Sequence, residues 1–192
     1  AGVPVLYYIT PQVWAWGAGR LAELSRIVTR AAPILPFEES LLRSHGIDAT
    51  FVGHPLLDRI GDMPDRAGAR ATLGLAESDT VLALFPGSRA QEIDRHLDDF
   101  VRTARVLEAR VPGLRVVVSA APTVVIDPDR CPYPRVPSAS FTVLRAADAA
   151  LCKSGTTTLE AAVAGCPLAV AYRTSGWTYA IARRVVKIPH IG

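Results

Sequence analysis

The sequence predicts an α/β protein made of two Rossmann-like pieces, each built on a parallel sheet. Short apolar runs rich in Val, Ile and Leu alternate along the chain with longer segments of helical period. These runs are continuously apolar, which is typical of strands that helices cover on both faces. A length of 192 residues with 49% hydrophobic and 20% charged residues fits one or two globular domains.

The first part of the chain is predicted to hold five elements. In order they are a strand at 3–9, an amphipathic helix at 20–32, a short strand at 33–37, a helix at 38–46 and a strand at 49–55.

A polar segment with clustered Gly, Pro and Asp, residues 60–79, is the best linker candidate. We therefore expect the two pieces to join near residues 61–68. The first domain would cover residues 1–62 and the second would cover residues 63–192.

The second part repeats the alternation of strands and helices. In order we expect a strand at 80–85, a helix at 90–111, a strand at 114–120, a proline-rich irregular loop at 121–140, the run 141–144 with a short helix, a strand at 148–154, a helix at 156–165, a strand at 167–172 and a helix at 176–187.

Composition and charge narrow the function classes. A net charge of +3 and a pI near 9.0 permit contact with phosphates or an anionic membrane surface. The sequence contains no basic run interleaved with aromatics, so nucleic-acid binding is not expected. The opening segment reads as a strand in mid-fold without an initiator Met, which suggests a fragment. Cys131, Cys152 and Cys166 form no CxxC pair, and we expect small buried thiols in a reducing compartment.

The first of two informative turns follows the predicted strand 80–85, at the strand end where open parallel sheets bind ligands. Gly87 would let the backbone approach a ligand, Ser88 would cap the following helix, and Arg89 could fork onto a phosphate. Glu92, one turn further on, would complete the capping arrangement or orient Arg89. The alternative interpretation is a well-capped helix with an exposed arginine.

The second turn lies where another apolar strand gives way to small residues, Ser154, Gly155, Thr156 and Thr157. The N-terminus of a helix carries roughly half a positive charge, which would stabilise a diphosphate. Glu160 lies one turn further along the same face and could accept hydrogen bonds from a ribose diol. A capped helix with a solvated glutamate is the alternative interpretation.

Neither turn has the spacing of a P-loop or of the dinucleotide motif Gly-x-Gly-x-x-Gly, which favours a sugar nucleotide as the ligand. A serine hydrolase built on Ser88 or Ser154 would need a Gly-x-Ser-x-Gly elbow, and neither serine lies in one.

Five sequence blocks, taken in order, resemble lipid-A-disaccharide synthase, a glycosyltransferase family of the GT-B architecture. They are TPQVWAWGAGR, ILPFEE, FVGHPLLD, PGSRAQEI and KSGTTTLEAAVAGCPLAVAYR. The family is specified by four of these motifs taken together, PQVWAW, LPFE, GHP and PGSR. The block with SGT followed by Glu is shared by several GT-B enzymes.

The resemblance implies an inverting, metal-independent glycosyltransferase of bacterial lipopolysaccharide biosynthesis that uses no cofactor. It would transfer 2,3-diacylglucosamine from UDP-2,3-diacylglucosamine to 2,3-diacylglucosamine 1-phosphate and release UDP, which forms the β-1,6-linked disaccharide of lipid A. The resemblance also implies a cytoplasmic protein that is peripheral on the inner membrane, and a homodimer at full length.

Residue roles follow from the same resemblance. Gly87, Ser88 and Arg89 would meet the donor diphosphate beside the turn from Ser154 to Thr157, and Glu160 would hold the ribose. Arg89 and the helix N-terminus would carry the charge of the leaving group.

The resemblance also implies that parts of the family's chain lie outside this sequence. They are an earlier half-domain with an acidic residue implicated in catalysis, and a later segment with an asparagine and C-terminal helices. We therefore expect a fragment that is inactive alone, with the acceptor-activating base in the missing N-terminal part. Loop 121–139 is shorter and richer in proline than the family pattern.

Two alternatives stay open. One is another GT-B enzyme that uses UDP-N-acetylglucosamine, such as the lipid II-forming transferase or a 2-epimerase, although the tryptophan block argues against both. The other is an inactive nucleotide-binding fragment.

His54 could face the acceptor in an interdomain cleft. Trp14 and Trp16 would point the same way in an extended segment and could bind an acyl chain, although core packing is favoured. The helix 176–187 could contact acidic phospholipid with its basic residues. His45, His96 and His190 are expected on the surface.

Overall fold

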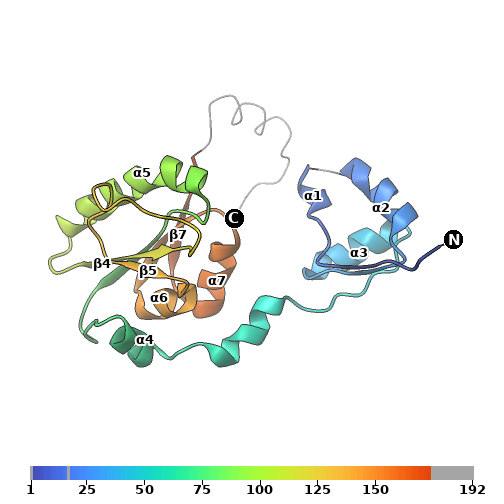
Figure 1. Cartoon of the computed structure of the whole chain (residues 1–192). Helices are drawn as coiled ribbons and strands as arrows, with labels where there is room; N and C mark the ends of the chain where they lie inside the picture. The colour runs from blue at the N-terminus through green and yellow to red at the C-terminus, as the bar shows by residue number, and fades with distance from the viewer. Residues whose placement is uncertain (1, 17, 174–192) are drawn as a thin grey trace. The chain divides into compact units, whose positions relative to one another are not determined.

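The computed structural model describes residues 2–16 and 18–173 (Figure 1). Contacts divide this part of the chain into two units, residues 2–59 and residues 60–173. Strands in both units pair in parallel, and helices alternate with them. The predicted α/β class with parallel sheets is therefore confirmed. The predicted helix 176–187 and its membrane contact lie outside the described residues.

The first unit consists of short elements around one small core. In chain order they are β1 (Leu6–Tyr8), α1 (Val13–Trp16), the 3-10 turn η1 (Ala18–Arg20), α2 (Leu21–Ile27), β2 (Arg30–Ala32) and α3 (Pro36–Ser44), followed by η2 (Pro55–Asp62). Strands β1 and β2 form a parallel pair. The buried core residues are Val13, Leu21, Leu24, Ala31, Leu42, Ile47 and Ala49.

The predicted helix 20–32 is wrong in its second half, because α2 ends at Ile27 and β2 begins at Arg30. Ile27, Val28 and Thr29 are β-branched in succession, and such residues lose side-chain freedom in a helix and favour extended backbone. The strand of this segment is therefore β2, not the predicted run 33–37.

Residues 33–37 instead lead into a helix, so the predicted strand there is wrong. Pro36 is the first residue of α3, a position at which proline's missing N–H costs nothing. Glu38 accepts a hydrogen bond from the backbone N–H of Leu35 at 3.2 Å, which closes the helix start.

The predicted strand 49–55 shrinks to a single parallel bridge between Ala49 and Ala31. Gly53 has a φ of 84°, and Pro55 begins the 3-10 helix η2, so the extended backbone cannot continue.

The second unit is a parallel sheet of five strands in the order β5-β4-β3-β6-β7, combined with four helices (Figure 1). The strands are β3 (Val81–Phe85), β4 (Arg115–Ala120), β5 (Arg135–Pro137), β6 (Ala149–Lys153) and β7 (Leu168–Ala171). The helices are α4 (Arg66–Thr72), α5 (Ala90–Glu108), α6 (Ser140–Ala146) and α7 (Thr156–Ala164). Helix α5 lies on one face of the sheet, and α4, α6 and α7 lie on the other.

Two segments predicted as irregular contain regular elements. The polar segment 60–79 holds α4, whose N-cap Asp65 accepts a hydrogen bond from the Gly68 N–H at 2.7 Å. The loop 121–140 holds β5, which pairs with β4 at the edge of the sheet. The prolines of this segment favour a loop in the sequence, but proline is tolerated in an edge strand, where one side of the backbone has no partner strand.

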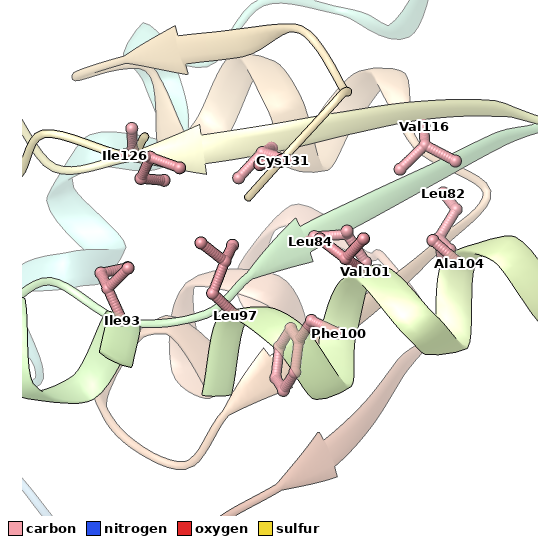
Figure 2. Packing of buried hydrophobic residues seen from close by; sticks show 12 residues of the cluster. Leu82, Leu84, Ile93, Leu97, Phe100, Val101, Ala104, Val116, Ile126 and Cys131 are labelled. Carbon is pink, nitrogen blue, oxygen red and sulfur yellow. The ribbon is translucent and has the colours of Figure 1, made fainter. Parts of the chain in front are cut away.

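One cluster of buried hydrophobic residues lies between α5 and the sheet (Figure 2). Leu97 and Ala104 on α5 have no exposed surface, and Phe100 is 2% exposed. They pack on the face of β3 and β4 that carries Leu82 and Val116. Because Leu, Phe and Ala recur on one side of α5, its opposite side is left to charged residues.

The order of the strands positions the ends of β3 and β6. From β3 the chain moves outward through β4 to β5, then returns to the other side of β3 to form β6. Phe85 and Cys152 are partners in the parallel register, so β3 and β6 end at the same edge of the sheet. In such sheets ligands bind at the carboxyl ends of the strands where the order reverses.

Candidate functional site

The two turns singled out from the sequence follow neighbouring strands. Residues 86–89 connect β3 to α5, and residues 154–155 connect β6 to α7. Both turns therefore leave the sheet at its carboxyl edge, side by side. We call this pair of turns, with Glu92 and Lys153, the β3–β6 site.

Both turns contain a glycine with a conformation that other residues rarely adopt. Gly87 has a φ of 142° and Gly155 has a φ of 158°. A Cβ at Gly87 would lie 2.5 Å from the Glu92 Cβ, and one at Gly155 would lie 3.2 Å from the Lys153 Nζ. The backbone of each turn thus lies directly against a charged side chain.

Glu92 joins the two turns. Its Oε2 accepts a hydrogen bond from the Ser88 N–H at 2.9 Å, and its Oε1 lies 3.2 Å from the Arg89 Nη1. The same Oε1 accepts from the Lys153 Nζ at 2.9 Å. Of the two roles predicted for Glu92, orientation of Arg89 and closure of the helix start, the structure shows both. A donor-binding role for this carboxylate stays a prediction.

The pKa of Glu92 is lowered to about 2. Burial by itself would raise this pKa. The hydrogen bonds from Lys153 and from the Ser88 N–H, together with the charges of Lys153 and Arg89, outweigh burial and favour the ionised form. Glu92 is therefore a carboxylate at every pH at which the protein is expected to work.

Ser88 does not cap α5, and the prediction that it does is wrong. The N-cap of α5 is Arg89, which makes no side-chain capping bond. The Glu92 carboxylate instead accepts from the N–H of Ser88, the residue before the N-cap. Ser88 is exposed, and the Arg89 side chain is 80% exposed, so both can reach a bound molecule.

Helix α7 begins without a side-chain cap. Its N-cap is Gly155, which has no side chain to accept from the first N–H groups of the helix. The Thr158 hydroxyl turns back to the Gly155 carbonyl at 2.7 Å. Thr156 is exposed and Thr157 is half-buried at this end. The Thr158 N–H also donates to the Gly155 carbonyl, at 3.1 Å, so the N–H groups of Thr156 and Thr157 are left to pair with water or with an anion.

Lys153 is a residue of the site to which the sequence patterns assign no role. It is the last residue of β6, and its side chain is 16% exposed. Besides its ion pair with Glu92, its Nζ lies 5.9 Å from the centre of the Tyr172 ring. The signal that could have found it is a single lysine at the end of a buried apolar strand.

Glu160 is half-buried on the second turn of α7. Its place one turn behind Thr156 agrees with the predicted spacing, and its contact with a ribose stays a prediction.

His96 is buried, at 3% exposure, so the prediction that it lies on the surface is wrong. Its Nε2 accepts from the Arg173 N–H at 3.0 Å, so Nδ1 carries the proton that is donated to the Glu92 carbonyl at 2.7 Å. His96 therefore ties the start of α5 to the residues after β7. His45 is exposed, as predicted, and His190 lies outside the described residues.

The remaining candidates lie in the first unit. His54 is half-buried, and its Nδ1 accepts from the Leu56 N–H at 3.1 Å, which closes the start of η2. The Trp14 indole N–H donates to buried Glu38 at 3.1 Å, and its ring meets Phe37 edge to face at 5.2 Å. Residues 13–16 are helical, so the predicted extended segment is wrong. The Trp16 side chain lies outside the described part of the structure.

The three cysteines are buried and free, as predicted. Burial raises the pKa of Cys152 to about 12, so this thiol is not a nucleophile.

Within the described residues, His, Cys, Asp and Glu side chains form no group of three or more that could hold a metal ion. A membrane-spanning helix is likewise not found in that part of the chain.

The whole chain is similar to curated lipid-A-disaccharide synthases. The protein of that name from Trichlorobacter lovleyi is 41% identical over 200 residues, which cover 100% of this chain and 52% of the relative. The one from Syntrophus aciditrophicus is 41% identical over 199 residues, with the same two shares. The chain thus spans about half the length of the curated relatives it matches.

A solved structure described as a glycosyl transferase of family 9 from Veillonella parvula is more distantly similar. It superimposes with a TM-score of 0.47 at 11% identity and covers 88% of this chain and 71% of that chain. This likeness is too weak to support an inference. The model of the lipid-A-disaccharide synthetase family, in contrast, matches residues 2–192. Together with the identities to curated relatives, this match shows that the chain belongs to the lipid-A-disaccharide synthetase family.

Proposed function

We propose that the protein to which this chain belongs transfers 2,3-diacylglucosamine from UDP-2,3-diacylglucosamine to 2,3-diacylglucosamine 1-phosphate. In this reaction an acceptor hydroxyl forms a bond to C1 of the donor sugar, and the bond between C1 and the diphosphate breaks. UDP leaves, and the hydroxyl proton passes to a base, which we expect outside this chain. Membership of the family supports the proposal, and so does the name of its curated members, lipid-A-disaccharide synthase.

One structural observation supports the proposal for the residues of the β3–β6 site. Neighbouring strands β3 and β6 bring the turn at Arg89 and the uncapped start of α7 to one edge of the sheet. A diphosphate there would meet an exposed guanidinium and free helix N–H groups at once. Both groups stabilise negative charge, which grows on the leaving UDP during the reaction. Residues 60–173 would thus form the donor side, and residues 2–59 would belong to the acceptor side.

The donor's uridine would extend from the diphosphate along α7. Glu160 lies one helical turn beyond Thr156 and would accept hydrogen bonds from the ribose hydroxyls. His54, Trp14 and Trp16 stay candidates for contact with the acceptor or its acyl chains.

The acylated substrates place the reaction at a lipid surface. We propose that the full-length protein works at the cytoplasmic face of the inner membrane as a peripheral protein, and as a homodimer. Contact with anionic phospholipid would draw on the excess of basic residues in the chain.

The test is the change Arg89→Ala in the full-length protein, with transfer of the acylated sugar as the measurement. We expect a loss of turnover of roughly a hundredfold or more, the usual effect of removing one group that stabilises transition-state charge. Arg102→Ala serves as the matched control, because Arg102 is also an exposed arginine of α5, 76% exposed, and pairs with the nearby Asp99. Unchanged turnover in Arg89→Ala would remove Arg89 from the reaction.

A further inference from the structure

The β3–β6 site contains more positive charge than its own carboxylate neutralises. Arg89 and Lys153 both contact Glu92 Oε1, at 3.2 Å and 2.9 Å. Two cations and one anion leave a formal charge of +1, and the positive end of α7 begins at Gly155 beside them. An additional anion would complete this arrangement.

Lys153 is held in place within this cluster. The side chains of Lys153 and Glu92 are 16% and 15% exposed, so water screens their ion pair only weakly. A Cβ at Gly155 would lie 3.2 Å from the Lys153 Nζ, so the ammonium group lies against the backbone of the turn that begins α7. The centre of the Tyr172 ring lies 5.9 Å from the same Nζ.

Lys153 lies where the dipole of a helix opposes a positive charge. A cation beside the N-terminus of a helix is repelled by the aligned peptide dipoles. Glu92 receives one hydrogen bond from Nζ, which has three N–H donors. Lys153 is also one of only two lysines among 21 basic residues, the other being Lys187. A compact ammonium on a flexible stem suits a second anionic partner beside Glu92.

We propose that Lys153 is a second cationic ligand of the donor diphosphate, aimed at the start of α7 by its ion pair with Glu92. This inference rests on the proposed function, since it assigns a further residue to the same donor site. In the bound state Lys153 keeps its bond to Glu92 and donates a further N–H to a phosphate oxygen. Arg89 would contact the diphosphate from the β3 side and Lys153 from the β6 side.

The test is calorimetric titration of the full chain with UDP, UMP and uridine. Wild type should prefer UDP over uridine. Lys153→Met should lower UDP affinity about tenfold or more, the range for a lost hydrogen bond between charged groups, and should leave uridine affinity unchanged. Lys153→Arg should keep most of the preference for UDP. Thermal unfolding of each variant verifies that it is folded.

A double variant separates ligand binding from simple charge neutralisation. If Lys153 only balanced Glu92, Lys153→Met combined with Glu92→Gln would restore UDP affinity. We expect the double variant to remain about as weak as Lys153→Met. Arg130→Met is the matched control for net charge, because Arg130 pairs with Asp94 and Asp98 and belongs to neither turn, and its UDP preference should equal that of wild type.

A second measurement needs no substitution at the site. Selective ¹³C labelling at the lysine Cε keeps the charge and all three N–H donors, and yields two lysine Cε signals from this chain. The Lys153 signal, assigned by its absence in Lys153→Met, should shift with UDP and remain in place with uridine.

The outcomes distinguish the inference from the proposed function. A wild type that binds UDP no better than uridine would contradict the donor site itself and the role of Lys153 with it. A wild type that prefers UDP, with Lys153→Met or the double variant equally selective, would overturn only the role of Lys153. An unshifted Lys153 signal at saturating UDP would overturn it as well.

Discussion

Gly87 shows how little room the β3–β6 site leaves at the scale of one residue. Its φ is 142°, and an added Cβ would lie 2.5 Å from the Glu92 Cβ and 2.9 Å from Oε2. The backbone must therefore move, or Glu92 must give up its contacts with Ser88 and Lys153.

We expect Gly87→Ala to destabilise the fold by about 1–3 kcal/mol, the usual cost of a strained backbone position, and to weaken UDP binding. Urea unfolding and calorimetry measure the two effects. Gly61→Ala is the control, because an added Cβ there meets nothing within 4 Å and its φ is not positive. Equal stability and equal UDP affinity in Gly87→Ala would contradict the close fit of Gly87 against Glu92.

Glu92 makes the fold sensitive to acid. Its pKa falls from 4.5 in a free side chain to about 2 in the folded protein, against the effect of burial, because Lys153, the Ser88 N–H and Arg89 favour the carboxylate. The unfolded chain therefore binds a proton at higher pH than the folded protein. The stabilisation is fully present above pH 4.5 and is lost as the pH falls toward about 2.

We expect the free energy of unfolding to decrease over this range in wild type and to decrease less in Glu92→Gln. Urea unfolding at a series of pH values measures the slope. Lys153→Met should reduce the slope in part, since it removes one of the groups that lower the pKa. Parallel curves for wild type and Glu92→Gln would show that Glu92 does not contribute to the acid sensitivity.

At the scale of the elements, Arg70 fixes α4 to the rest of the second unit. Its side chain is 1% exposed and donates to the carbonyl of Ala146 at 3.0 Å, to that of Ala76 at 2.8 Å and to Asp148 at 3.0 Å. Asp148 also accepts from the Val81 N–H at 2.8 Å. Burial alone would raise the pKa of Asp148, but the hydrogen bond from Val81 and the positive charges of Arg66 and Arg70 lower this pKa.

We expect Arg70→Met to destabilise the protein by about 1–3 kcal/mol, because it leaves the carbonyls of Ala146, Ala76 and Glu77 without this donor and removes one of the donors to Asp148. Arg30→Met is the matched control. Arg30 also pairs with an aspartate, Asp48, but the two side chains are 65% and 53% exposed, so about 0–1 kcal/mol is expected. Urea unfolding compares the two, and an equal loss would contradict the anchoring role of Arg70.

At the scale of the whole molecule, both turns of the β3–β6 site belong to one unit, residues 60–173. We expect UDP to slow amide hydrogen exchange at residues 86–92 and 153–160, while exchange in α3 remains unchanged. Mass spectrometry after exchange with and without UDP measures this, with uridine as the control for the nucleoside alone. Protection confined to the first unit would contradict the location of the donor.

The sequence alone determined the α/β class, the strands from β3 onward except β5, and both turns. These features depend on local signals, because continuous apolar runs, helical periods and turn glycines act over a few neighbouring residues. The resemblance of five sequence blocks also predicted the family to which the chain was then shown to belong.

Tertiary structure alone decided which groups meet. Glu92 and Lys153 are 61 residues apart, and only the placement of β6 beside β3 brings them to 2.9 Å. The same holds for buried His96, whose partner Arg173 is 77 residues away. Strand order and the burial of a polar side chain result from contacts between distant segments, which no local pattern encodes.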